Sequence, residues 1–394
     1  MSEIAWEITS LSELGTFSRG KSKHRPRNDV KLFEGGKYPL VQTGDVKAAN
    51  LYITKNDSYY NDFGLKQSKL WPAGTLCITI AANIAETAIL SYPMCFPDSI
   101  VGFNANPEKS SELFVYYFFE YIKKEIQKSA SGSIQDNINI DYLSKMRIKV
   151  PEKKYQDKIV ELLSSIDKKI LLNNQINQEL EAMAKTLYDY WFVQFDFPDQ
   201  NGKPYKSSGG KMVNHPELKR EIPEGWGVAR LDQLQIATGK RDANFGTENG
   251  KYDFWTTANS PIKADEFSFE GRAILIAGNG NFYVNFTDGK FEAYQRTYVI
   301  QSEDEKMLIF MYMACLQSAE KLRKASNGSI IKYITIGDVN NISSPYNHNV
   351  VDEFVKIYRP LIDQISKNKK QNQELNQLRD WLLPMLMNGQ VKVE

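Results

Sequence analysis

The stretch YQDKIVELLSSIDKKILLNNQINQELEAMAKTLYDYW, residues 155–191, decides the fold of this chain. It contains no Gly or Pro, and its apolar residues step by three or four positions from Ile159 to Tyr190, with a polar gap around Asn173. This spacing is the roughly 3.5-residue period of a coiled-coil seam. The stretch therefore predicts one long helix whose apolar stripe must be buried against another helix.

The chain repeats this stretch about half its length further on. Residues 354–387 read FVKIYRPLIDQISKNKKQNQELNQLRDWLLPMLM, and the tetrapeptide NQEL occurs at 177–180 and again at 372–375, an offset of 195 residues. The two copies place matching residues in one predicted seam. It comprises Ile170, Asn173, Leu180, Met183 and Leu187 in the first copy and Ile365, Asn368, Leu375, Leu378 and Leu382 in the second.

The economical partner for each helix is the other copy. Two such repeats related by a pseudo-two-fold axis across the coil must run antiparallel. Asn173 and Asn368 stand where an apolar residue would be more stable, and a buried polar residue of this kind selects register and partner at a cost in stability. The alternative is that both asparagines simply face solvent.

The blocks between the helices are also duplicated. The first opens WEITSLSELGTFSRGK at Trp6 and the second opens WGVARLDQLQIATGK at Trp226, so both reach a Gly-Lys pair, at Gly20-Lys21 and Gly239-Lys240. They close alike as well, with SASGSIQDNINIDYL from Ser129 and KASNGSIIKYITIGDV from Lys324. The chain is therefore a two-copy repeat rather than a solenoid.

These features predict an α+β protein with two mixed α/β domains at opposite ends of an antiparallel two-helix coiled coil. The stretch between the first helix and the second block is rich in Gly, Pro, Ser and charge, which is typical of a linker. We expect a first domain at 1–151, a helical spacer at 152–195, a linker at 196–222, a second domain at 223–345 and a second helical spacer at 346–394.

Each block is predicted to contain short strands and one helix. β-Branched and aromatic runs bounded by Pro, Gly and Asn indicate the strands, and longer periodic segments indicate the helices. In the first block the strands are Tyr38–Thr43, Leu76–Ala81, Thr87–Tyr92 and Ile100–Phe103, with a helix at Leu113–Lys128. In the second they are Tyr252–Thr256, Ala273–Ala277, Phe282–Phe286 and Tyr298–Gln301, with a helix at Lys306–Lys324.

Composition is that of an ordinary globular protein, with 42% hydrophobic and 25% charged residues and a net charge of +1. The longest apolar run, Leu308 to Leu316, is far shorter than the roughly 20 residues of a membrane span. The start MSEIAWEITS lacks secretory character, and three isolated cysteines favour a reducing cytoplasm. The length of 394 residues indicates two or more domains.

Common catalytic motifs are absent from the sequence. Gly250-Lys251 lacks the rest of a phosphate-binding loop, and Gly278-Asn279-Gly280 lacks the third glycine of a dinucleotide site. Ser344-Pro345-Tyr346 has only one of the two prolines of the adenine-methyltransferase tetrad. The three histidines do not cluster with the cysteines, which argues against a metal site. We therefore expect no catalytic residues, no metal and no cofactor in this chain.

The strongest binding signal is SRGKSKHRPRND, residues 18–29, where basic residues alternate with small or polar ones. Such a mobile cationic loop suits phosphates or guanine edges in a major groove. A solvated basic loop is the alternative. Other polar residues able to distinguish bases follow the predicted strands, although each is also an ordinary turn or strand-end residue. The DNA-binding candidates are Arg19, Lys21, Lys23, Arg25, Arg27, Gln42, Thr43, Asn83 and Gln135 in the first block and Lys240, Arg241, Asn244, Thr256, Asn279, Gln295 and Arg296 in the second.

The whole chain resembles the specificity subunit of type I restriction-modification systems. The resemblance is carried by the repeated helices, by NGKPYKSSGGKMV followed by EIPEGW at 201–226, and by the opening WEITSLSEL. It implies two target recognition domains, each reading half of a split DNA sequence, and helical spacers that bind two methyltransferase subunits, with restriction subunits joining that core. The partner subunits would use S-adenosylmethionine for methylation, and ATP with Mg for restriction.

The favoured hypothesis is thus a cytoplasmic, non-catalytic subunit that reads an asymmetric, two-part DNA target and positions its partners on it, in defence against foreign DNA. A helix of this length is about 55 Å long. With both domains on one DNA face, the half-site centres are expected near one helical turn, about 10 bp, apart. One alternative is a coiled-coil adaptor that joins protein partners without reading DNA. The other is an enzyme with an unrecognised site.

Overall fold

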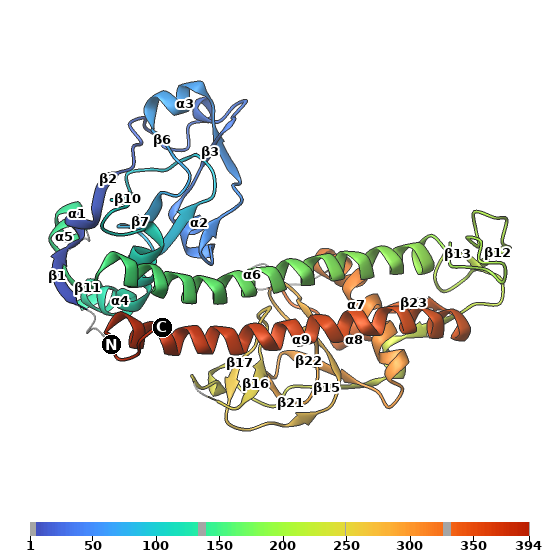
Figure 1. Ribbon diagram of the computed structural model, residues 1–394. Helices are drawn as coiled ribbons and strands as arrows, with labels where there is room; N and C mark the ends of the chain where they lie inside the picture. The colour runs from blue at the N-terminus through green and yellow to red at the C-terminus, as the bar shows by residue number, and fades with distance from the viewer. Residues whose placement is uncertain (1–4, 133–138, 249, 326–331, 394) are drawn as a thin grey trace. The chain divides into compact units, whose positions relative to one another are not determined.

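The computed structural model describes residues 5–132, 139–248, 250–325 and 332–393 (Figure 1). The chain forms two compact units. Unit 1 comprises Met1–Leu172 with Gln371–Glu394, and unit 2 comprises Asn173–Lys370. Each unit contains one mixed α/β domain together with a portion of each long helix.

The two long helices are α6 (Lys153–Tyr188), continued by a π-helical turn at Asp189–Val193, and α9 (His348–Met387). Both predicted helices are present. Helix α9 begins at His348, before the repeated stretch 354–387, and the side chain of Asn347 accepts hydrogen bonds from the backbone N–H groups of Asn349 and Val350, at 3.1 and 3.2 Å.

Within each unit the helix segments run antiparallel. In unit 1, Arg379 Nη1 contacts Asp167 Oδ1 at 2.9 Å, and Tyr155, earlier in α6, accepts a bond from Val393 N, beyond the end of α9. In unit 2, Asn368 Nδ2 bonds Asn177 Oδ1 at 2.8 Å, while the ring of Tyr188 packs on Phe354. Residue numbers rise along one helix as they fall along the other, so the predicted antiparallel pairing is confirmed.

Unit 1 is built on a five-stranded sheet, β2-β10-β7-β8-β4, and a four-stranded sheet, β5-β3-β9-β6, with the antiparallel pair β1–β11 beside the helices. Its strands are β1 (Trp6–Ser10), β2 (Gly15–Arg19), β3 (Tyr38–Leu40), β4 (Tyr52–Ile53), β5 (Ser58–Tyr60), β6 (Leu70–Trp71), β7 (Leu76–Thr79), β8 (Thr87–Leu90), β9 (Met94–Cys95), β10 (Ile100–Ala105) and β11 (Arg147–Pro151). Its shorter helices are α1 (Leu11–Leu14), η1 (Val30–Leu32), α2 (Thr43–Ala48), α3 (Asp62–Gln67), α4 (Glu112–Gly132) and α5 (Ile140–Lys145).

Unit 2 contains the sheets β15-β22-β19-β20 and β17-β16-β21-β18 and the pairs β14–β23 and β12–β13. Its strands are β12 (Met212–His215), β13 (Arg220–Pro223), β14 (Gly227–Arg230), β15 (Gln235–Thr238), β16 (Tyr252–Trp255), β17 (Ile262–Ala264), β18 (Phe269–Glu270), β19 (Ala273–Ala277), β20 (Val284–Thr287), β21 (Lys290–Ala293), β22 (Thr297–Gln301) and β23 (Ser343–Tyr346). Its shorter helices are η3 (Leu231–Gln233), η4 (Ala243–Phe245), α7 (Glu305–Ala325) and α8 (Ile336–Asn340).

The two domains share one topology even where their sequences do not match. The sheet order β2-β10-β7-β8 corresponds to β15-β22-β19-β20, and β5-β3-β9-β6 corresponds to β17-β16-β21-β18. In the second pair of sheets the central contact is parallel in both copies, β3 with β9 and β16 with β21. The duplication therefore extends through the divergent middle of each block.

The central strands are apolar on both faces because each is covered twice. Every residue of β7 and of β19 is buried. Leu76 and Ile78 of β7 join the core that also contains α4 and α6, whereas Cys77 joins a second core with Trp71. This double cover explains why the sequence shows continuous apolar runs here rather than alternation. The three cysteines are buried and free, and burial raises the pKa of Cys95 to about 11.

One local expectation was wrong. The segment predicted as one strand over Tyr38–Thr43 ends as a strand at Leu40, and Thr43 begins α2. The stretch 196–222 contains β12 and most of β13, which pair as a hairpin, and Phe197 and Ile222 are buried in the unit 2 core. Phe197 stacks on Tyr205, with ring centroids 4.8 Å apart.

The buried face of the helix pair follows the predicted seam as far as Asn173 and Asn368 and differs from it further along each helix. Ile170, Asn173, Ile365 and Asn368 are buried, but Met183 and Leu378 are 57% and 43% exposed, so these two do not lie in the seam. The half-buried members are Leu180, Leu187, Leu375 and Leu382. The buried stripe instead passes through Asn177 and Ala184 on α6 and through Asn372 and Leu383 on α9.

No helix in the described ranges is long and apolar enough to cross a membrane. Those same ranges hold no group of three or more His, Cys, Asp or Glu side chains placed to bind a metal.

Candidate nucleic-acid interface

In the first domain the backbone at the Gly20-Lys21 pair passes directly over a tight turn formed by a distant segment. We call this close approach the Gly-Lys crossing. Strand β2 ends at Arg19, and the next residues run over the turn Phe96–Ile100: Gly20 N donates to Ile100 O at 2.9 Å and Lys21 N to Phe96 O at 3.1 Å. A Cβ atom on Gly20 would lie 2.2 Å from the carbonyl oxygen of Pro97. Only glycine fits this close approach.

The second domain repeats the same crossing. Gly239 N donates to Thr297 O at 2.9 Å and Lys240 N to Ala293 O at 3.1 Å. A Cβ atom on Gly239 would lie 2.1 Å from the carbonyl oxygen of Tyr294. The crossing therefore places basic residues at an equivalent position of each domain.

In the first domain, three predicted arginines gather around one residue, Asp98, of the crossed turn. Arg19 Nε donates to the Asp98 carbonyl at 2.6 Å, Arg27 Nη2 to its carboxylate at 2.5 Å, and Arg25 Nη2 lies 3.7 Å from the carboxylate. The Arg25 and Arg27 side chains remain 54% and 49% exposed. The basic loop is thus held against the domain rather than free, and still presents positive charge to solvent.

The remaining basic residues of this loop are tied through the backbone. Lys21 N is bound as described, and Lys23 N donates to Gln67 O at 3.2 Å. His24 Nε2 lies 2.7 Å from Asp29 Oδ2. This hydrogen bond and a second from the N–H of Lys31 hold the pKa of Asp29 below its ordinary value.

Asn83 lies in a strained loop between β7 and β8. Ala82, Asn83 and Ala85 all have positive φ, at 51°, 53° and 62°. Non-glycine residues in this region cost about 1–3 kcal/mol each and persist where neighbours over-determine the conformation. Such strain is common at binding sites.

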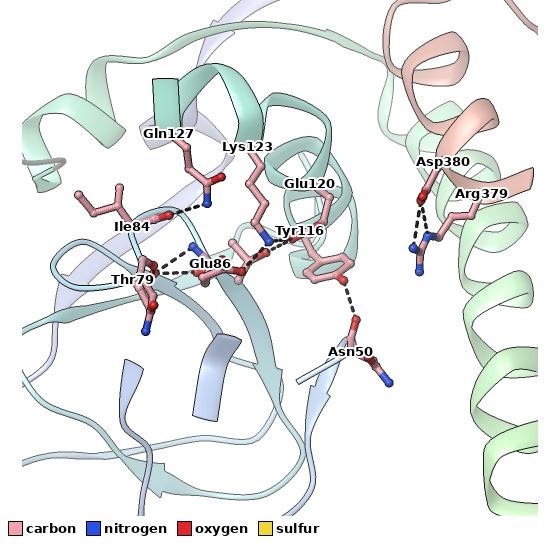
Figure 2. Close-up of polar contacts among 12 residues, drawn as sticks. Asn50, Thr79, Ile84, Glu86, Tyr116, Glu120, Lys123, Gln127, Arg379 and Asp380 are labelled. Atoms are coloured by element: carbon pink, nitrogen blue, oxygen red, sulfur yellow. Dashed lines mark hydrogen bonds and ion pairs between the residues drawn. The ribbon is translucent and has the colours of Figure 1, made fainter. Parts of the chain in front are cut away.

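Figure 2 shows how α4 holds that loop. Lys123 Nζ pairs with Glu86 at 2.6 Å, and Gln127 Nε2 donates to Ile84 O at 3.0 Å. Thr79 Oγ1 accepts from Glu86 N at 3.0 Å on the strand side. In addition, Lys47 Nζ of α2 donates to Asn83 Oδ1 at 3.4 Å. The strained conformation is therefore held by contacts from α4, β7 and α2.

Gln42 and Thr43 lie at the start of α2, where Gln42 is the N-cap residue. Val41, just before them, donates its N–H to Cys95 O at 2.8 Å, which places this start beside the turn that the basic loop crosses. Gln135 lies outside the described residues, as does Gly328 in the second copy of that segment.

In the second domain most predicted residues converge. Gln295 N donates to Arg241 O at 2.9 Å, and Thr297 Oγ1 donates to Thr256 O at 3.1 Å. Asn279 forms an isolated bridge to Tyr333 beside the same turn. Asn244 lies further along the loop, in the turn η4 that Asp242 caps.

A polar, half-open cavity of about 360 Å³ lies at this convergence. It is lined by Thr238, Gly278, Gln295, Arg296, Tyr298 and Ile334. Burial and the Asp338 carboxylate raise the pKa of Tyr298, and the positive charge of Arg296 opposes that rise. Sequence reasoning identified Gln295 and Arg296 here but not the cavity, because its other lining residues have no distinctive chemistry.

Sequence reasoning also missed the carboxylates that hold the arginines. In the first domain the Asp98 carboxylate accepts from Arg27, and in the second Arg241 donates to Glu292 and Glu266. The available signal was Glu292 itself, a charged residue between Phe291 and Ala293 in a strand whose other residues are apolar or at its edge.

Comparison with known proteins gives a consistent result. The family model described as "Type I restriction modification DNA specificity domain" matches residues 3–182 and 223–377. The MjaIX specificity subunit of Methanocaldococcus jannaschii is 26% identical over 99% of this chain and 94% of its own length. The HindI specificity subunit of Haemophilus influenzae is 24% identical over 93% of this chain and 97% of its own length.

The fold is also similar to a solved structure. The type I restriction-modification S subunit from M. genitalium superposes with a TM-score of 0.61 at 17% sequence identity, covering 98% of this chain and 97% of that one.

Proposed function

Because the family model covers both halves of the chain, the chain belongs to the type I restriction-modification DNA specificity family, and we propose that it reads an asymmetric, two-part DNA target. It is the non-catalytic DNA specificity subunit of such a system, with two target recognition domains. Methylation with S-adenosylmethionine and ATP-dependent restriction belong to the partner subunits.

In this proposal residues 1–151 read one half-site and residues 223–345 read the other. The Gly-Lys crossing supports this assignment, because the same close approach puts basic residues at the equivalent position of each domain. The two faces carry different side chains: three arginines around Asp98 in the first, and Gln295, Arg296 and a carboxylate-bound Arg241 in the second. Different side chains on a common scaffold predict two different half-sites.

The gap between half-sites is proposed to follow from the helical spacers at 152–195 and 346–394. Helix α6 has 36 residues and is about 54 Å long at 1.5 Å per residue. Half-site centres about 10 bp apart match one turn of DNA. The buried Asn177–Asn368 pair supports a single register between the helices in unit 2.

Two methyltransferase subunits are proposed to dock on the helices. Met183 and Leu378 occupy equivalent positions of the repeat, and both are exposed apolar side chains. Equivalent apolar surfaces on the two copies suit two copies of one partner. Restriction subunits join this core, and the complex acts on DNA in the cytoplasm.

The decisive experiment inserts four residues into α6 and four into α9, and maps methylated sites in a host that supplies the partner subunits. Four helical residues add about 6 Å, so the gap is expected to change by about two base pairs while both half-sites persist. As a control, exchanging residues 223–345 for those of a relative should change one half-site only. Altered half-sites at an unchanged gap would contradict the proposal.

A further inference from the structure

Arg241 is held in an unusual way, and we propose that it reads a guanine edge in the second half-site while the buried Glu292 positions it. The proposal rests on the assignment of the second domain to one half-site. Arg241 follows directly from the Gly239-Lys240 crossing, and its side chain is 34% exposed.

Glu292 is a charged residue with no solvent contact. Its side chain is 0% exposed on β21, and its carboxylate accepts from Arg241 Nε at 3.2 Å, Ser268 Oγ at 2.7 Å and Ala293 N at 2.9 Å. Burying a carboxylate is costly and is tolerated only when charge and hydrogen bonds compensate it. Here the compensating charge is an arginine at the surface, so the carboxylate fixes the direction of a side chain that solvent and ligands can reach.

Three contacts define the orientation of the guanidinium. Glu292 accepts from Nε, Glu266 accepts from Nη2 at 2.6 Å, and the Phe245 ring lies 4.3 Å from the central carbon. The carboxylates take the edge formed by Nε and Nη2, and the ring covers one face. The opposite edge keeps two parallel N–H donors, from Nη1 and Nη2, with no protein acceptor among the described residues.

That free edge is the one a guanine requires. Guanine presents O6 and N7 side by side in the major groove, and a guanidinium edge offers one N–H to each in a fixed plane. A lysine ammonium is a point charge on a flexible stem and lacks this preset geometry. A preset orientation lowers the entropy lost on binding. Because two carboxylates, Glu292 and Glu266, more than balance the single positive charge of Arg241, we expect it to act through the orientation of its donors rather than through attraction to phosphate.

Arg296 provides a natural comparison on the same face. Its neighbour Gln295 donates its backbone N–H to Arg241 O at 2.9 Å, so the two arginines lie on adjacent segments. Arg296 lines the cavity, and no carboxylate among the described residues pairs with it. An unpaired, exposed guanidinium suits a phosphate, which carries no sequence information.

The test measures base preference position by position, using the chain assembled with its methyltransferase subunits. Arg241→Lys keeps the charge and should lower discrimination at one G·C pair of the second half-site by about 10- to 100-fold, leaving every other position unchanged. Glu292→Gln should shift the same position in the same direction by a smaller factor. Methylated-site sequencing and binding to oligonucleotides substituted at each base pair both report this.

Two controls separate geometry from charge. Glu266→Gln removes the exposed partner, 65% exposed, and should change discrimination less than Glu292→Gln does. Arg296→Ala should weaken DNA binding evenly across sequences. It should also reduce the slope of log binding constant against log salt concentration by about 1.

Either of two results overturns the proposal: Arg241→Lys methylates the same sites with the same preferences, or it loses affinity evenly at all positions. Exchange of residues 223–345 tests the underlying assignment separately. If that exchange leaves both half-sites unchanged, the proposed function fails instead. A melting temperature for Arg241→Lys equal to that of the parent chain shows that the change is not one of folding.

Discussion

The polar pair in the helix seam of unit 2 can be tested with leucine at Asn177, at Asn368 and at both. The two side chains are 5% and 4% exposed and share a hydrogen bond of 2.8 Å. Gln364 Nε2 also donates to Asn368 Oδ1 at 2.7 Å. The pair is therefore enclosed: Asn368 Nδ2 donates to Asn177 Oδ1, and Asn368 Oδ1 is occupied by Gln364.

The expected magnitude follows from what each single change leaves behind. Asn368→Leu removes the donor to Asn177 Oδ1, and a buried acceptor without its donor costs about 1–3 kcal/mol. Each leucine also adds buried apolar surface, but this contribution is present in the single and the double variants and cancels in a double-mutant cycle. The double variant should therefore be more stable, by about 1–3 kcal/mol, than the summed free-energy changes of the two single variants predict.

Urea denaturation of the parent chain, the two single variants and the double variant measures the coupling between Asn177 and Asn368. Mapping of methylated sites reports the register of the helices. Without the polar pair the seam of unit 2 loses a contact that selects register, so the double variant should methylate sites with more than one gap. If the free energies of unfolding simply add and the gap stays single, the asparagines neither depend on each other nor select register.

Two further predictions concern the crossing glycine and the exposed helix residues. Gly239→Ala should lower the free energy of unfolding by about 1–3 kcal/mol, because its Cβ would lie 2.1 Å from a backbone oxygen. Gly227→Ala is the control: its Cβ would meet open space, so the free energy of unfolding should stay nearly the same. Thermal or urea denaturation measures both. Met183→Glu with Leu378→Glu should abolish co-purification of the methyltransferase subunits without lowering the melting temperature. Ile8→Glu, at a position 65% exposed on β1, is the matched control, and retained co-purification by the double variant would place the docking surface elsewhere.

The helix pair was predictable because its information is local and duplicated. A gap-free periodic stretch and its copy together predict length, pairing and direction, and the structure has all three. The face that becomes buried was less predictable. Sequence reasoning followed large apolar residues to Met183 and Leu378, whereas helix packing buried Ala184, the residue after Met183, and Asn177, about two turns before it.

The recognition faces were predictable in part, for a different reason. A basic cluster is visible in sequence, but its partners are brought by distant segments. Asp98 is 71 residues from Arg27, and Glu292 is 51 residues from Arg241. No local pattern links such pairs, so the sequence indicated a mobile cationic loop where the fold forms an ordered one. The topology shared by the divergent block centres was hidden similarly, since strand order depends on non-local pairing.

Unit 1 is assembled from both ends of the chain, and this affects how the protein is made. Leu383, Leu386 and Met387 of α9 lie in the same core as Ile159 and Leu163 of α6. A ribosome delivers the N-terminal residues first, so these three α9 side chains join the core only after all of unit 2 has been synthesised. During that interval the apolar surface that they cover is available to chaperones and proteases. A premature stop codon in the second half of the gene should therefore remove the first domain's stability as well, leaving no half-functional reader to misdirect the system.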